Sequence, residues 1–121
     1  MNKDKIAIIG LGYVGLPLAR LFATKYPVVG FDINTDRITE LMTGVDYTLE
    51  VDNETLQSVL IDKNTDSNGL FCTNKFDEIK DCNYYIITVP TPVDKNNRPI
   101  LTPLIKASET VGAVLKKGDV V

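Results

Sequence analysis

The 121-residue sequence predicts an α/β fold with a doubly wound, mainly parallel sheet. Three observations predict it. Short apolar runs at residues 6–9, 28–31 and 84–89 alternate with segments of helical periodicity. The last of these runs lacks polar alternation, which is typical of a central parallel strand buried on both faces. A glycine-spaced turn, residues 10–15, follows the first run directly. Together they predict a single Rossmann-type domain over residues 1–121.

The glycine turn has the spacing of a dinucleotide-binding fingerprint, with Gly10, Gly12 and Gly15 at the required intervals. We expect Gly10 to permit the tight strand-to-helix turn and Gly12 to let the backbone approach a pyrophosphate. Gly15 would let the helix pack closely on the strand. Amides at the start of that helix would then face the phosphates, assisted by the helix dipole. The alternative is a glycine-rich turn that packs well and binds nothing.

An acidic residue, Asp32, ends the second apolar run. A carboxylate there is expected to accept hydrogen bonds from the adenosine ribose hydroxyls and to repel a 2′-phosphate, which favours NAD over NADP. Its alternative role is a cap or turn former, because Asn34 and Thr35 follow. Arg37 leaves NADP open, since an arginine could reach a phosphate or lie along the adenine.

The first half of the chain is expected to supply three helices around two strands. The helix at residues 14–25 has Leu18, Leu21 and Phe22 as its apolar stripe. A second helix covers residues 35–42, and a third follows Asp52 as its N-cap and reaches Leu60.

The second half repeats the alternation. A short strand at residues 70–73 and a single helical turn at 76–80 precede the strand at 84–89. A helix to about residue 116 would be capped by Thr102, with Pro103 at its first position.

Asp119, Val120 and Val121 begin what reads as a fifth strand, expected beside the fourth. The fold is therefore expected to be truncated after the start of this strand. The expectation is that the chain is the N-terminal part of a longer enzyme.

Composition excludes several classes of function. A net charge of −3 provides no general attraction for nucleic acid or anionic membranes, and no apolar run reaches the length of a membrane span. We therefore expect no nucleic-acid partner, no membrane partner and a cytoplasmic location. The chain has no histidine, and Cys72 and Cys82 match no metal-ligand spacing, so no metal site is expected. Both cysteines are expected to be buried, reduced thiols.

Several sequence runs resemble one family, the UDP-glucose/GDP-mannose dehydrogenases. Residues 8–17 (IIGLGYVGLP) are close to its version of the glycine fingerprint, and residues 88–92 (TVPTP) are similar to its loop after the fourth strand. Residues 48–51 (TLEV), 101–104 (LTPL) and 107–112 (ASETVG) resemble the branch that acts on UDP-N-acetylhexosamines. That branch includes the UDP-N-acetylgalactosamine and UDP-N-acetylglucosamine 6-dehydrogenases of capsule and O-antigen synthesis. Ile100 departs from the branch, which commonly has an acid at this position.

The resemblance implies oxidation of a nucleotide sugar at carbon 6 to the uronic acid, with two hydride transfers to NAD. It implies that Tyr13 and Val14 join the three glycines in contacting the phosphates, and that Arg37 lies at the adenosine end of the cofactor. It further places the run Val89, Pro90 and Thr91 at the cofactor, with Thr91 holding a catalytic water. The alternative for Thr91 is a hydroxyl that caps the turn after the strand.

The family's thiol nucleophile, lysine and asparagine belong to its second half, so the resemblance implies that this chain binds NAD without turnover. The nucleotide sugar would then bind mostly outside it, and the whole enzyme is expected to be a homo-oligomer. A different class of function also fits the residues, namely a free-standing regulatory or redox-sensing module that uses NAD as a ligand. A third is a structural module with a degenerate fingerprint.

Overall fold

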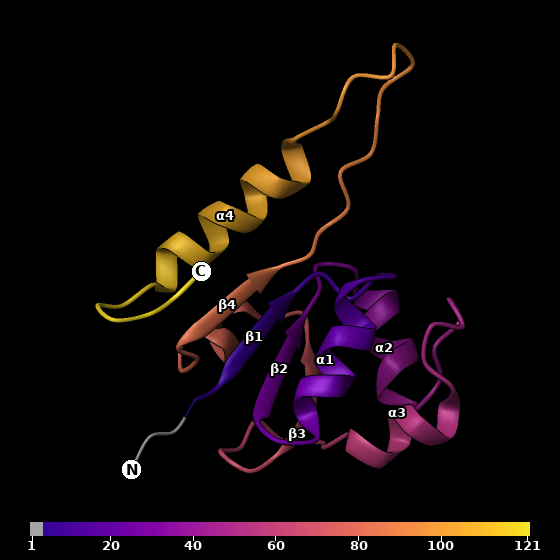
Figure 1. Cartoon of the computed structure of the whole chain (residues 1–121), viewed down its shortest axis with the longest axis vertical. Helices are drawn as coiled ribbons and strands as arrows, with labels where there is room; N and C mark the ends of the chain where they lie inside the picture. Colours follow the sequence, from indigo (N-terminus) through magenta and orange to yellow (C-terminus); the bar gives the residue numbers. More distant parts are fainter. Residues whose placement is uncertain (1–3) are drawn as a thin grey trace.

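The structure is a computed structural model that describes residues 4–121 (Figure 1). Four parallel strands form its sheet in the order β3-β2-β1-β4. The strands are β1 (Ile6–Ile9), β2 (Pro27–Phe31), β3 (Gly69–Thr73) and β4 (Tyr84–Ile87). Val120 bridges the outer edge of β4 in parallel, since Tyr85 N–H donates to the Val120 carbonyl at 2.8 Å. The predicted mainly parallel Rossmann sheet is thus confirmed, and the fifth segment lies beside the fourth strand as expected.

Helices cover both faces of this sheet (Figure 1). They are α1 (Gly15–Ala23), α2 (Thr35–Met42), α3 (Asn53–Val59), the short 3₁₀ helix η1 (Phe76–Ile79) and α4 (Thr102–Val114). β1 shows the division, because Ile6 and Ile8 pack with α1, α2 and α3, whereas Ala7 and Ile9 pack with η1 and α4. Burial on both faces explains why β1 is an uninterrupted apolar run.

The stripe predicted for α1 is wrong in part. Leu21 is 57% exposed, and the buried face is formed by Leu16, Ala19 and Ala23 together with Gly15. Leu18 and Phe22 pack only at its flank. The small residues decide the orientation because they let the helix axis come close to the sheet, which a pattern of large apolar residues does not reveal.

One predicted helix cap is confirmed and one is wrong. Asp52 accepts a hydrogen bond from Thr55 N–H at 2.8 Å and caps α3, as expected. The predicted cap of α4 is wrong: Thr102 is already the first helical residue, and Leu101 at the N-cap makes no side-chain cap bond. α4 also ends at Val114, before residue 116, because the chain turns extended at Leu115.

β4 is shorter and less central than its sequence predicts. It ends at Ile87, two residues before the expected end, and it is the edge of the four-stranded sheet, bridged on its outer side by Val120. The chain then extends away from the sheet as an arm, residues 90–101, closed by a bridge between Val93 and Pro99 (Figure 1). Pro90 and Pro92 lack the N–H groups that continued strand pairing would require.

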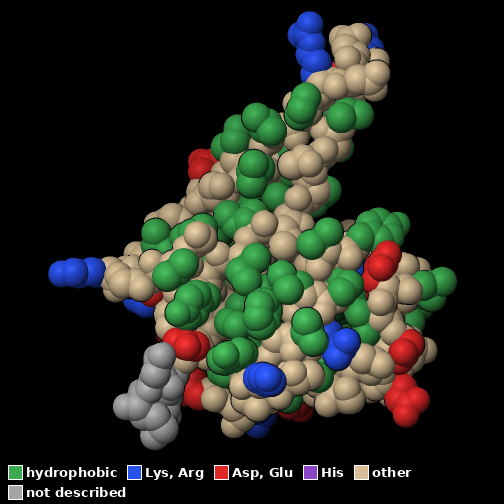
Figure 2. Space-filling view, viewed as in Figure 1, with side chains coloured by type: hydrophobic (Ala, Val, Ile, Leu, Met, Phe, Trp, Pro, Cys, Tyr) green, Lys and Arg blue, Asp and Glu red, His purple; other side chains and the backbone are tan. Residues whose placement is uncertain are grey.

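Hydrophobic side chains gather along α4 and over the neighbouring edge of the sheet (Figure 2). The exposed ones on and beside α4 include Leu101, Leu104, Ile105 and Leu115. A continuous apolar surface of this kind is typical of a face that packs against other protein. Within residues 4–121, no helix has both the length and the apolar character required to cross a bilayer.

Candidate functional site

A hollow of about 1010 Å³ opens at the carboxyl ends of β1, β2 and β4, the edge at which open α/β sheets bind ligands. The strand order reverses here, because β1 lies between β2 and β4. Six of the predicted site residues line the hollow: Gly10, Gly12, Asp32, Arg37, Val89 and Pro90. The other four, Tyr13, Val14, Gly15 and Thr91, are not among its lining residues.

A different feature of the structure explains the glycine at each of the three positions. Gly10 has φ +101°, a conformation that side-chain-bearing residues rarely adopt. A Cβ at Gly15 would lie 1.8 Å from the Gly10 carbonyl oxygen, so the close approach of α1 to the turn requires glycine. A Cβ at Gly12 would meet nothing within 4 Å. The protein's own packing therefore explains Gly10 and Gly15, whereas Gly12 preserves open space beside the hollow.

Thr88, the residue directly after β4, anchors this turn. Its Oγ1 donates to the Gly10 carbonyl at 2.7 Å, and its N–H donates to the Ile9 carbonyl at 2.8 Å. From the other side, Gly10 N–H donates to the Phe31 carbonyl at 2.7 Å. The turn is thus held by both strands next to β1. Sequence reasoning included Thr88 only as part of a motif and missed this contact, which joins residues far apart in the chain.

The start of α1 is left available to an anion. No side chain caps it and no acidic residue lies in its first turn. By contrast, α2 is capped by Asn34 and α3 by Asp52, and each has an acid in its first turn. The first backbone N–H groups of a helix lack partners within it, and the helix dipole makes this end favourable for negative charge. Tyr13 and Val14 are exposed on this approach.

Asp32 faces the same turn. Its Oδ2 accepts from Leu11 N–H at 2.9 Å, and its Oδ1 accepts from Asn34 N–H at 2.9 Å. The contact with Asn34 N–H is the turn-forming role given above as the alternative for Asp32. The N-cap of α2 is Asn34, not Asp32. An ionised carboxylate has about four acceptor positions, so Asp32 retains capacity for ribose hydroxyls while it holds the turn.

Arg37 lines the hollow, where its Nε and Nη1 bind the protein and its Nη2 is buried without a hydrogen-bond partner among the described residues. The residue is 7% exposed. Its Nε donates to the Leu11 carbonyl at 2.7 Å, and its Nη1 donates to Glu40 at 2.7 Å and to Asp46 at 2.8 Å. Its expected position at the adenosine end of the cofactor stays a prediction.

Asp46 was missed by the sequence reasoning because it lies in a segment without periodicity. It is 1% exposed, and it accepts hydrogen bonds from Arg37, from Thr48 and from the amides of Glu50 and Val51. Burial on its own would raise the pKa of this carboxyl. The hydrogen bonds from Thr48, Arg37 and Val51 outweigh burial and lower the pKa from 3.8 to about 2.

The lowered pKa predicts a pH dependence of stability. A carboxyl whose folded pKa lies below its unfolded value stabilises the fold above the unfolded pKa, and this contribution is lost as pH falls. We expect Asp46 ionisation to add about 2 kcal/mol at neutral pH, lost between about pH 4 and pH 2. Urea unfolding of the unmodified chain and of Asp46→Asn across this range measures it. The difference between the two should shrink as pH falls; a constant difference would contradict the assignment.

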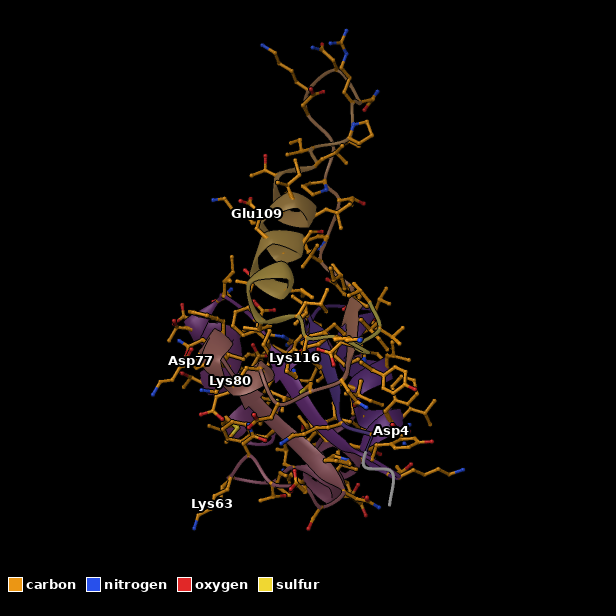
Figure 3. All side chains as sticks on the ribbon, turned by 90° about the vertical axis from the view of Figure 1, so that its left-hand side faces the viewer. Asp4, Lys63, Asp77, Lys80, Glu109 and Lys116 are labelled. Carbon is orange, nitrogen blue, oxygen red and sulfur yellow. The ribbon has the colours of Figure 1, made fainter. Side chains whose placement is uncertain are left out.

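The far wall of the hollow comes from the loop after β4 and from α4. Lys106, Glu109 and Thr110 line it, and Glu109 lies on the part of α4 above the sheet (Figure 3). Glu109 and Thr110 were expected only as part of a family motif, and Lys106 was not singled out. Thr91 is exposed at the base of the arm.

The two cysteines do not line the hollow. Cys72 and Cys82 are free and buried, as predicted. Burial raises the pKa of each thiol to about 12, so neither carries thiolate at neutral pH. Within residues 4–121, no cluster of three or more histidine, cysteine or acidic residues could hold a metal ion.

Comparisons with known proteins agree with this geometry. Residues 4–121 match the UDP-glucose/GDP-mannose dehydrogenase family, NAD binding domain. The whole chain is 56% identical to the UDP-N-acetyl-D-glucosamine 6-dehydrogenase of Salmonella typhi and 52% identical to that of Pseudomonas aeruginosa, covering 27% of each. The solved structure of a UDP-D-ManNAc dehydrogenase from Pyrococcus horikoshii superposes with a TM-score of 0.79 at 35% identity, over 96% of this chain and 27% of that one. The chain thus spans about a quarter of the length of these relatives.

Proposed function

The chain belongs to the UDP-glucose/GDP-mannose dehydrogenase family, as its NAD-binding domain, and from this we propose that it supplies the cofactor site of a nucleotide-sugar 6-dehydrogenase. The proposed substrate is a UDP-N-acetylhexosamine, which the whole protein would oxidise to the uronic acid. Support comes from the relatives, which are named as dehydrogenases of such sugars. They favour an enzyme over a free-standing regulatory module. The expected homo-oligomer and cytoplasmic location belong to the same proposal.

One observation carries the assignment of the cofactor site: the open space over Gly12. The residues around it fit NAD. Gly12 leaves room for a pyrophosphate where a Cβ would intrude, and the uncapped start of α1 offers amides and a favourable dipole to its charge. Asp32 lies beside the turn with acceptor capacity for ribose hydroxyls.

We assign the chain's residues to binding and orientation. The amides at residues 12–15 would hold the pyrophosphate, Asp32 the adenosine ribose, and Val89 and Pro90 the wall at the end of β4. Thr91 is proposed to hold a water near the reacting carbon. When bound, NAD supplies a hydride acceptor. Asp32 in addition disfavours a 2′-phosphate through charge repulsion.

Two measurements test the proposal. Calorimetric titration of the chain with NAD should show one binding site, with no NADH formed when a UDP-N-acetylhexosamine is added. The whole protein should form two NADH per sugar with UDP-N-acetylglucosamine or UDP-N-acetylgalactosamine, and less with UDP-glucose. Absence of NAD binding by a chain that circular dichroism shows to be folded would overturn the assignment of the cofactor site. Preference for UDP-glucose would overturn the assigned substrate.

A further inference from the structure

Leu11, in the middle of the glycine turn, is held at both of its backbone polar atoms. Its N–H donates to Asp32 Oδ2 at 2.9 Å, and its carbonyl accepts from Arg37 Nε at 2.7 Å. Leu11 lies between Gly10 and Gly12, so its N–H and its carbonyl belong to the two successive peptide groups at the centre of the turn. Asp32 and Arg37 therefore act on the turn as a pair.

Two carboxylates also bind the Arg37 guanidinium. Nη1 donates to Glu40 Oε2 at 2.7 Å and to Asp46 Oδ1 at 2.8 Å, and all three side chains are largely buried. Glu40 and Asp46 are themselves fixed by backbone amides: Tyr47 N–H donates to Glu40, and three amides donate to Asp46. The guanidinium is thus fixed in orientation.

The same contacts determine the charge of this corner of the hollow. Arg37 is a single positive group, whereas its two carboxylate partners and Asp32, which binds the Leu11 N–H, are three negative groups, so negative charge is in excess. Lys106 also lines the hollow, but it comes from α4 on the other face of the sheet. An arginine near a ribose site can accommodate a 2′-phosphate, and here two carboxylates already compensate the charge of Arg37.

We propose that Glu40 and Asp46 are positioning residues that act through Arg37, aligning the Leu11 carbonyl and excluding 2′-phosphorylated dinucleotides. Cofactor choice then depends on three carboxylates rather than on Asp32 alone. This inference rests on the proposed function, because it assumes that the adenosine ribose binds beside Asp32.

The test is the ratio of two dissociation constants, for NADP and for NAD, measured by calorimetry in one low-salt buffer. Glu40→Gln removes one charge and keeps a group that can accept from Arg37. We expect the NADP-to-NAD ratio to fall roughly tenfold, because one fewer negative charge repels the 2′-phosphate, while NAD affinity changes by less than about threefold. Raising the salt concentration should reduce the difference, since screening weakens interactions between charges.

The matched control is Glu54→Gln, which removes the same charge from the exposed first turn of α3. Its ratio should equal that of the unmodified chain. A merely structural role for Glu40 would lower the melting temperature without changing the ratio, and an unchanged ratio in a folded Glu40→Gln chain that binds NAD would overturn this inference alone. If the folded, unmodified chain bound neither dinucleotide, the proposed function would fail and this inference with it.

Discussion

Gly12→Val is expected to leave the chain folded and to weaken NAD binding on the order of a hundredfold, about 2.7 kcal/mol. The substitution adds a side chain where a Cβ meets no protein atom within 4 Å, so the free protein accommodates it. In the complex, the same space would be needed by the pyrophosphate, which approaches the backbone at this glycine. Thermal unfolding and calorimetric titration of one preparation measure the two effects separately.

The chain contains a matched control for this variant. A Cβ at Gly112, on the exposed side of α4, also meets nothing within 4 Å, and Gly112 does not line the hollow. Gly112→Val should therefore bind NAD like the unmodified chain. If Gly12→Val lowered the melting temperature strongly, or bound NAD normally, the open space at Gly12 would not be there for a ligand.

Gly15→Ala is expected to act on the fold instead of the ligand site. We expect it to lower the free energy of unfolding by roughly 3 kcal/mol. The added Cβ would lie 1.8 Å from the Gly10 carbonyl oxygen and 2.4 Å from Thr88 Oγ1, so α1 must move away from the turn. That movement disturbs the bond between Thr88 and Gly10, which anchors the turn. Urea unfolding measures the loss.

A change below about 1 kcal/mol in Gly15→Ala would show that α1 can shift freely, which contradicts the tight packing described here. The two glycine variants thus separate a requirement of the fold from a requirement of the ligand, although both residues belong to one motif.

Most of the fold could be predicted because its signals are local. Strand positions followed from apolar runs, and the cap of α3 from the chemistry of Asp52. The buried face of α1 could not be predicted from large apolar residues, because Gly15 and Ala19 decide which side approaches the sheet. The cap of α4 was misplaced by one residue, since Thr102 follows the N-cap.

The glycines and Asp32 of the candidate site could be predicted from the residues themselves, because the spacing of a dinucleotide-binding fingerprint is a local signal. The groups that hold these residues could not. Thr88, which follows the neighbouring strand β4, donates to the Gly10 carbonyl. Asp46 lies in an irregular loop and accepts a hydrogen bond from Arg37 of α2. Such partners depend on where the folded chain brings distant or aperiodic segments, which no periodicity encodes.

The most direct test of the central claim is to follow the backbone amide signals of the isotope-labelled chain by nuclear magnetic resonance as NAD is added. The account predicts that the largest shifts occur at residues 10–15 and 32–34, around the turn at the carboxyl end of β1. Shifts centred elsewhere, for example on the separate shallow hollow lined by Met42, Leu60, Ile61 and Asp62, or no shifts at saturating NAD, would contradict it.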